Sequence, residues 1–267
     1  MVNFKQNKSQ LDEKGYSLVE NIYSTEEIET ITSIIDSKET NEETFRKSED
    51  LFAIRQFHKE VPEVLPIVFN DNFKNLVQTV FGDEKSFITK SIYFDKPEKS
   101  NWFVSYHQDL TISVDKKDEL EGFQNWTTKQ NQFAVQPPIE ILEKTTTFRI
   151  HLDDTSKENG ALKVISESHK KNIYRPETID FEMEEEVFCE IKKGGVMLMK
   201  PLTLHASNRT TNHKRRRVIH IEMNTQDLPF DLKWSEKLFY IYCYYHEKNN
   251  TILLSRFISN LFCLSQL

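Results

Sequence analysis

Two side chains with metal-binding chemistry lie one residue apart in the segment SYHQDLTIS, residues 105–113. Side chains alternate between the two faces of a β-strand, so His107 and Asp109 would share one face and Gln108 the other. An imidazole and a carboxylate side by side are two thirds of a metal site. The rest of the chain must therefore supply a second imidazole.

A second histidine follows in GGVMLMKPLTLHASN, where His205 comes after a short apolar run that begins with Gly194 and Gly195. Two histidines and one carboxylate form the facial triad of non-haem Fe(II) oxygenases, which leaves coordination positions open. His-x-Asp alone is weak evidence, because most such pairs are structural or lie on the surface. The prediction of a metal site therefore depends on the sequence around the pair.

An arginine lies 11 positions after His205 and opens the strand-like run RRVIHIEM, since 216 − 205 = 11. Alternation places Arg216, Val218, His220 and Glu222 on one, mostly polar face and leaves the other face mostly apolar. The polar face would line a site, and a guanidinium there could bind a carboxylate in bidentate fashion. A surface strand with Arg216 in solvent is the alternative.

In these stretches the sequence resembles the phytanoyl-CoA dioxygenase-like family of Fe(II)/2-oxoglutarate-dependent oxygenases. The resemblance covers roughly residues 11–237. It is carried by GYSLVENIYSTEEI, YHQDLTI, HLDDTSKENGALKVISESHK, GGVMLMKPLTLHASNRT and RRVIHIEM, in that order. It implies a mainly β fold with flanking helices, a double-stranded β-helix, which is a cupin-like jelly roll of two facing sheets.

The resemblance also implies a set of site residues. His107, Asp109 and His205 match the Fe(II) ligands of the family. Asp109 is informative, because related halogenases have a small residue at that position, so a halogenase is disfavoured.

A second group of matches concerns the co-substrate. Arg216 matches the arginine that binds the distal carboxylate of 2-oxoglutarate, and Ser207 matches a serine that often assists it. Arg55, in FAIRQF, matches a basic residue near the co-substrate more loosely. The implied reaction uses O₂ and 2-oxoglutarate to hydroxylate a small molecule, with succinate and CO₂ as co-products.

Four further residues are candidates for contact with the substrate. Arg149 and His151 alternate on TTTFRIHLD, and many relatives have an aromatic or small residue at the Arg149 position. This departure indicates a polar or anionic substrate, with a core salt bridge as the alternative. His220 on RRVIHIEM, as a substrate-facing or a buried structural residue, and Trp126 complete the group.

The elements that must position these residues can be read from the periodicity. Ser24 and Glu27 form a capping box that begins an amphipathic helix, and a second helix covers DNFKNLVQTVF and ends at Gly82. From about residue 86 short β-type runs follow one another, which is typical of a jelly roll backed by helices. The stretch from Val114 to Thr145 is expected to be an irregular loop that covers the metal cavity, with Trp126 or Phe133 near its mouth.

The chain is expected to hold one jelly-roll domain, residues 1–237, and a C-terminal extension, residues 238–267. Docking on the domain and formation of a homodimer are both open for the extension, as is a peripheral, poorly ordered segment.

The composition indicates the cellular compartment of the protein and the kinds of partner it binds. The chain has 267 residues, 37% of them hydrophobic, and a net charge of −7, which argues against nucleic acid or an anionic membrane as the main partner. Three cysteines without a CxxC pair indicate a reduced, cytoplasmic protein. The polar N-terminus is unlike a signal peptide, and no apolar run of 18 residues predicts a membrane span.

The predicted function is that of a 2-oxoglutarate-dependent dioxygenase acting on a small molecule. This function has two rivals. One is a non-oxidative, metal-dependent jelly-roll enzyme such as an isomerase or hydrolase, which loss of Arg216 would favour. The other is a non-catalytic binding protein on the same fold, which loss of a metal ligand would favour.

Overall fold

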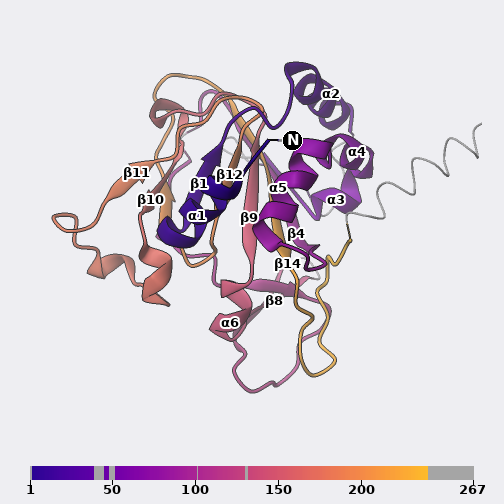
Figure 1. Ribbon diagram of the computed structural model, residues 1–267, viewed down its shortest axis with the longest axis vertical. Helices are drawn as coiled ribbons and strands as arrows, with labels where there is room; N and C mark the ends of the chain where they lie inside the picture. Colours follow the sequence, from indigo (N-terminus) through magenta and orange to yellow (C-terminus); the bar gives the residue numbers. More distant parts are fainter. Residues whose placement is uncertain (1, 39–44, 48–51, 101, 130–131, 240–267) are drawn as a thin grey trace, which may run out of the picture.

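The computed structural model describes residues 2–38, 45–47, 52–100, 102–129 and 132–239. Seven antiparallel strands form the larger sheet, in the order β1 (Tyr16–Val19), β12 (Val196–Met199), β9 (Thr146–His151), β14 (Arg216–Asn224), β4 (Phe87–Lys96), β3 (Phe52–Arg55) and β2 (Phe45–Lys47). A four-stranded sheet has the order β11 (Glu186–Phe188), β10 (Leu162–Ile165), β13 (His205–Ser207) and β5 (Val104–His107). Figure 1 shows β10 and β11 beside β1 and β12 of the large sheet.

The two sheets face each other, as a jelly roll requires. Leu162 and Val164 of β10 pack against Met197 and Met199 of β12 in one buried cluster that also holds Cys189. The predicted architecture of two facing antiparallel sheets with flanking helices is therefore confirmed.

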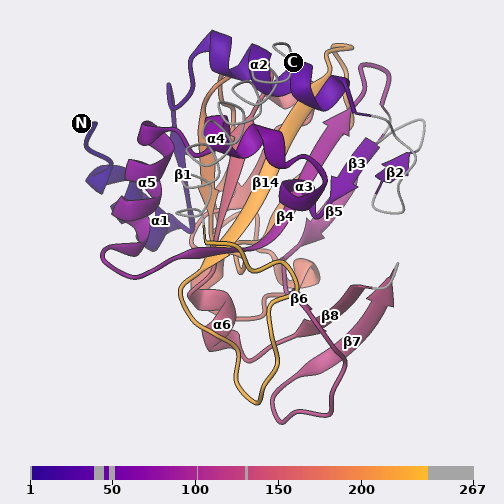
Figure 2. The same ribbon diagram turned by 90° about the vertical axis from the view of Figure 1, so that its right-hand side faces the viewer.

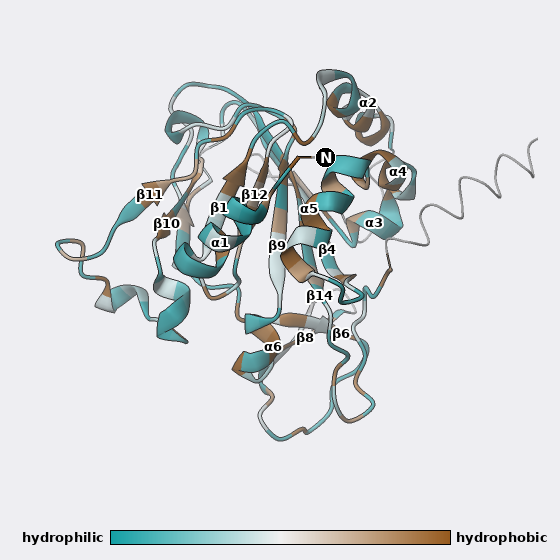
Figure 3. Cartoon of the chain, in the orientation of Figure 1, coloured by the Kyte–Doolittle hydropathy of each residue, from teal (hydrophilic) through white to brown (hydrophobic). Residues whose placement is uncertain are grey.

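Helices cover the outer face of the large sheet (Figures 1 and 2). Their bounds are α1 (Lys5–Lys14), α2 (Thr25–Asp36), α3 (Phe57–Glu60), α4 (Leu65–Val68) and α5 (Asp71–Phe81), with α6 (Ile139–Glu143) below the sheet; single 3₁₀ turns lie at η1 (Pro62–Val64), η2 (Lys157–Asn159), η3 (Ser168–Lys171) and η4 (Pro176–Thr178). Ile31 of α2 and Phe73 of α5 share one buried cluster with Phe148 of β9 and Ile219 of β14. Figure 3 shows hydrophobic residues on β1, β12 and parts of α2, α4 and α5, with hydrophilic residues on the exposed sides of these helices.

Alternation along β14 divides its side chains between the two faces. Ile219 and Ile221 belong to the cluster under the helices, whereas Arg216, His220 and Glu222 lie on the opposite face. The buried polar face of β14 therefore points toward the interior between the sheets, and a solvent-exposed Arg216 is ruled out because its exposed fraction is only 7%.

The two predicted helices are confirmed. The Ser24 hydroxyl accepts from the Glu27 N–H at 3.1 Å and the Glu27 carboxylate accepts from the Ser24 N–H at 2.7 Å, which begins α2. Gly82 ends α5 with a φ of 66°, a conformation that a residue with a Cβ rarely adopts. Within the described residues, no helix is both long and apolar enough to cross a bilayer.

The prediction of an irregular loop over Val114–Thr145 was wrong. Much of this segment joins a third antiparallel sheet, in the order β6 (Ile112–Val114), β8 (Gln132–Gln136) and β7 (Gln124–Lys129), followed by α6. Val114 of β6 and Val135 of β8 belong to a separate buried cluster. This cluster also contains Leu232 and Trp234, from near the end of the described chain. The three strands pair with one another, so the segment forms regular structure although its sequence shows few turn residues. Figure 2 shows this sheet at one end of the molecule.

The proposed C-terminal extension lies, from residue 240 onward, outside the described residues. Leu238 pairs with Ile88 of β4 through two backbone hydrogen bonds of 2.8 and 3.2 Å. The role of the extension, homodimer formation included, stays a prediction.

The segment just before Leu238 is bonded to the outer face of the large sheet by a buried carboxyl group. Glu236 is 2% exposed, and its Oε2 accepts from the Ser91 N–H at 2.9 Å. Burial raises the pKa of Glu236 to about 7, although the Ser91 N–H and the charges of Lys90 and Lys59 oppose this change. The folded state therefore holds this proton more tightly than the unfolded chain does, so the stability from this group is present below about pH 4.5 and is lost as the pH rises through about 7.

We expect Glu236→Gln to raise the free energy of unfolding at pH 8, by up to about 3 kcal/mol, because the amide oxygen keeps the Ser91 contact without a buried charge. The gain should fall below about 1 kcal/mol at pH 5, where the native carboxyl is already protonated and only the unfolded chain still loses its proton. Urea unfolding at both pH values measures this difference. The exposed Glu121→Gln should be neutral at both, and a pH-independent effect of Glu236→Gln would contradict the assignment.

Candidate metal centre

The two histidines of the predicted triad lie on neighbouring strands. β5 and β13 pair antiparallel with His107 directly opposite His205, and the centroids of the two imidazole rings are 4.2 Å apart. Residues opposite one another in such a pair have neighbouring side chains on the same face. Two segments almost 100 positions apart in the sequence are thus brought to one point of the smaller sheet.

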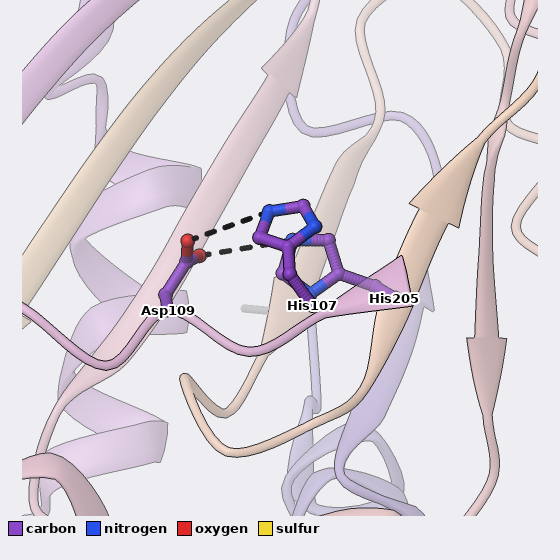
Figure 4. Close-up of side chains that lie close together, drawn as sticks. All are labelled: His107, Asp109 and His205. Carbon is purple, nitrogen blue, oxygen red and sulfur yellow. Dashed lines mark ion pairs between the residues drawn. The ribbon is translucent and has the colours of Figure 1, made fainter. Parts of the chain in front are cut away.

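Asp109 reaches the same point from outside the strand. The prediction that it continues the alternation of His107 was wrong, because β5 ends at His107. The Asp109 N–H donates to the Pro201 carbonyl at 2.9 Å, and this turn directs the carboxylate back toward the histidines. Its Oδ1 lies 4.0 Å from His107 Nε2 and its Oδ2 lies 3.9 Å from His205 Nε2 (Figure 4).

These separations fit a shared ion. One donor atom from each of the three residues lies within 4.8 Å of the other two. Two donors that each lie about 2.0–2.2 Å from one ion are at most about 4.4 Å apart, so the carboxylate already stands at a compatible distance from both histidines.

Backbone carbonyls fix which nitrogen each histidine offers. His107 Nδ1 lies 2.9 Å from the Ser105 carbonyl oxygen, and His205 Nδ1 lies 2.9 Å from the Thr203 carbonyl oxygen. A carbonyl can only accept, so each Nδ1 carries the proton and each Nε2 presents its lone pair beside Asp109. This arrangement is the usual outer support of a metal-binding histidine.

Electrostatics keep His205 and Asp109 in their metal-binding forms. Burial lowers the pKa of His205 to about 4 despite the nearby Asp109, so this imidazole is neutral near pH 7. Burial raises the pKa of the Asp109 carboxyl, but the nearby His205, His220 and Lys90 together hold it well below its usual value. The His107 side chain is 42% exposed, so one side of the centre is open.

Sequence reasoning missed the residue that anchors this turn. Gln108 points away from the donors, and its Nε2 donates to the carbonyls of Asn172 at 2.8 Å and Leu202 at 2.6 Å. Its Oε1 accepts from the Tyr174 N–H at 2.8 Å. The sequence predicted only that Gln108 points away from His107 and Asp109. Its partners could not be predicted, because they come from distant loops.

Two other predicted residues carry buried polar atoms that have no partner among the described residues. Arg216 is 7% exposed and Ser207 is 1% exposed. The Arg216 Nε and Nη1 and the Ser207 Oγ have no hydrogen-bond partner among the described residues. Burial and the nearby Arg149 lower the pKa of Arg216 to about 9, which leaves the guanidinium charged near neutral pH. A buried cation with unused donors fits the carboxylate of a ligand.

The predicted substrate residues fall into two places. Arg149 and His151 are buried on the inner side of β9, and His220 is Arg149's cross-strand partner on β14. The His151 Nδ1 lies 2.8 Å from the Thr155 hydroxyl, and its pKa is far below the usual value because of burial and the two arginines. Trp126 lies instead in the third sheet, against that sheet's own apolar cluster.

Arg55 is half-buried at the end of β3, opposite Ile92 of β4. In the described part of the chain, no hydrogen bond or ion pair joins Arg55 or Trp126 to the three metal-site residues.

Comparison with known proteins agrees with this geometry. The sequence matches the family model described as phytanoyl-CoA dioxygenase (PhyH) over residues 11–218. The chain belongs to the phytanoyl-CoA dioxygenase family. This family places it among the 2-oxoglutarate-dependent dioxygenases, with iron as the metal, 2-oxoglutarate as the co-substrate, and O₂ and a small molecule as the other reactants.

Solved structures share the fold at low sequence identity. EctD from S. alaskensis in its apoform has a TM-score of 0.64 at 18% identity, with 84% of this chain and 77% of that chain covered. SnoK, a non-heme alpha ketoglutarate-dependent carbocyclase from nogalamycin biosynthesis, has a TM-score of 0.61 at 16% identity and 84% coverage of both chains. HygX from Streptomyces hygroscopicus, with nickel and 2-oxoglutarate bound, has a TM-score of 0.58 at 14% identity, with 86% and 92% covered. No curated protein matches the sequence.

Replacing either histidine should remove one donor from the centre. We expect His107→Ala and His205→Ala each to weaken Fe(II) binding by more than about 100-fold, because loss of an outer-shell partner alone costs roughly 10–100-fold. Anaerobic titration of the full chain with Fe(II), or with Mn(II) read by electron paramagnetic resonance, measures the affinity. The exposed His213→Ala is the matched control, and metal affinity equal to that of this control would exclude the two residues as ligands.

Proposed function

We propose that this protein hydroxylates a C–H bond of a small molecule, using Fe(II), O₂ and 2-oxoglutarate. The observation that carries the proposal is the convergence of two Nε2 atoms and one carboxylate in an interior that also holds Arg216 and Ser207 with unused polar atoms. One oxygen atom of O₂ would enter succinate, formed with CO₂ from 2-oxoglutarate, and the other would enter the product.

The metal site would be built by His107, Asp109 and His205. When bound, Fe(II) supplies the redox chemistry that couples O₂ to the oxidation of both 2-oxoglutarate and the substrate. The protein's own part is to hold three donors on one side of the ion and to leave the other positions free. The hydrogen bonds from each Nδ1 to a carbonyl serve this purpose, because they keep both rings in orientation before the metal arrives.

The co-substrate site would be built by Arg216 and Ser207. Arg216 would bind the distal carboxylate of 2-oxoglutarate through one edge of its guanidinium, whose Nε and Nη1 have no partner among the described residues, and the Ser207 hydroxyl would donate to it. Ser207 follows His205 by two residues on β13, so metal and co-substrate contacts would come from one short strand. Arg55, on the same face of the large sheet as Ile92, would add positive charge to that face.

The two rivals explain less of the interior. A binding protein on this fold has no need for a carboxylate beside two imidazoles with preset tautomers, and a non-oxidative metal enzyme has no need for a buried guanidinium with unused donors. HygX carries nickel and 2-oxoglutarate, and a second EctD structure carries 2-oxoglutarate and 5-hydroxyectoine, so the same fold accommodates both kinds of ligand in those proteins. A reduced, cytoplasmic setting stays part of the proposal. Cys189 is a free, buried thiol, and burial raises its pKa to about 12, so it stays protonated near neutral pH.

Removing the guanidinium should separate co-substrate binding from metal binding. We expect Arg216→Gln to weaken 2-oxoglutarate binding by roughly 10- to 150-fold, because a charged hydrogen-bond pair is worth about 1.5–3 kcal/mol. Fe(II) affinity should stay within about threefold of the wild type. Anaerobic titration of the Fe(II)-loaded protein with 2-oxoglutarate, followed by the visible charge-transfer band, gives both numbers.

The control is Arg215→Gln, which removes a neighbouring guanidinium that pairs with Asp95 on the other face of the sheet. Unchanged 2-oxoglutarate affinity in Arg216→Gln would overturn the co-substrate site. Failure of the wild type to form the Fe(II)–2-oxoglutarate complex would overturn the proposed function itself.

A further inference from the structure

Arg149 is a second buried cation on the inner face of the large sheet. It is 7% exposed and lies on β9, between Met197 of β12 and His220 of β14. Its Nη1 lies 2.9 Å from His220 Nδ1, and its Nε has no hydrogen-bond partner among the described residues. Part of the guanidinium is therefore held in place while another part is unused.

The contact with His220 belongs to a chain of hydrogen bonds with one direction. Arg149 can only donate, so His220 Nδ1 accepts and the ring proton lies on Nε2. His220 Nε2 then donates to Glu222 Oε1 at 3.1 Å, and Lys90 Nζ donates to the same oxygen at 2.9 Å. These hydrogen bonds hold the Nη1 side of Arg149 in place. They also give the Glu222 carboxylate its partners without an ion pair to Arg149.

Among the described residues, no carboxylate is left for Arg149. Glu222 is paired with Lys90, and Asp109, an acidic group close enough to influence Arg149, is a ligand of the proposed metal site. Within the described parts of the chain, no carboxylate lies within 4 Å of the Arg149 guanidinium. Burial lowers the pKa of Arg149 to about 10, so the group remains charged at neutral pH and burial of that charge is not offset by an ion pair.

The unused part of Arg149 has the shape of a carboxylate site. The Nε–H and one N–H of Nη2 project from the same edge of a guanidinium and can bind both oxygens of one carboxylate. Apolar side chains also border the guanidinium: its carbon lies 6.0 Å from the centroid of the Phe94 ring, and Met197 is the cross-strand neighbour of Arg149 on β12. This combination suits a ligand with one carboxylate and an apolar body.

We infer that Arg149 is the specificity-determining residue of this oxygenase, and that the substrate is a small molecule with a carboxylate bound by the Nε–Nη2 edge of Arg149. His220 is a positioning residue that holds Arg149 from behind. The inference rests on the proposed function, because that function assigns Arg216 and Ser207 to the distal carboxylate of 2-oxoglutarate and the metal to its other end. Both ends of the co-substrate are then bound without Arg149.

Three probes with one carbon skeleton test the chemistry: pentanoate, pentanamide and pentyl phosphate. Each is titrated calorimetrically into the full chain under anaerobic conditions, with Fe(II) and saturating 2-oxoglutarate present so that the Arg216 site is filled. We expect pentanoate to bind at least about 10-fold more tightly than pentanamide, because only the carboxylate accepts two charged hydrogen bonds. Equal affinity of these two probes, or no binding of pentanoate, would overturn the inference, and tighter binding of pentyl phosphate would overturn the carboxylate assignment.

Variants then assign the effect to one residue. Arg149→Gln should weaken pentanoate binding about 10- to 100-fold and leave pentanamide binding unchanged, and Arg149→Lys should restore part of the loss. Arg215→Gln, on the opposite face, should bind all three probes as the wild type does.

The co-substrate titration separates this inference from its alternative. Arg149→Gln should form the Fe(II)–2-oxoglutarate complex with the affinity of the wild type, unlike Arg216→Gln. A loss of 2-oxoglutarate affinity equal to that of Arg216→Gln would instead place Arg149 in the co-substrate site and overturn the inference. Should Arg149→Gln fail to fold, the comparison of pentanoate with pentanamide in the wild type still decides.

Discussion

The register between β5 and β13 places His107 opposite His205, and every other part of the centre is arranged around that pair. A shift of one residue in this short pairing would turn one imidazole to the other face of the sheet, because side chains alternate with a period of two. The adjacent turn holds the register, since Gln108 is bonded to carbonyls of two separate loops and Asp109 is bonded to Pro201. The geometry of the metal site is thus secured by backbone contacts outside it.

The interior between the sheets carries more unsatisfied charge than a structural core would. The outer face of the large sheet packs Ile, Val and Phe side chains against the helices, while its inner face carries Arg149, Arg216, His151, His220 and Glu222. Burying polar groups without partners costs free energy, so unused donors on two arginines and one serine point to ligands that complete them. The stability provided by the helix-facing cluster allows the inner face to be kept for binding.

Not all polar groups on the inner face are open to ligands. A series of hydrogen bonds runs from Lys90 through Glu222 and His220 to Arg149. Arg216 faces the interior without a hydrogen bond of this kind to its Nε or Nη1 among the described residues. The two arginines are therefore physically different: one is oriented by a neighbouring imidazole, and the other has no hydrogen-bond partner for Nε and Nη1 among the described residues. This difference underlies the assignment of separate roles to them.

Local sequence was enough to predict helices α2 and α5, strand β14 and the types of residue at the site. The capping box at Ser24, the stop at Gly82 and the alternation of β14 rest on contacts within a few residues, so they could be predicted from the chain alone. The triad residues could be named because their motifs resemble a known family. The fold of residues 114–145 could not be predicted, because its strands are stabilised by Leu232 and Trp234 about 100 positions away.

Tertiary structure alone decided how the site residues relate to one another. Asp109 leaves the strand and still meets both histidines because Pro201, from another loop, accepts its N–H. Arg149 is tied to His220 because β9 and β14 are neighbours in the sheet, although the two residues are 71 positions apart. Strand order and register bring together side chains that no local pattern connects, since a sheet joins residues by hydrogen bonds across the chain and not along it.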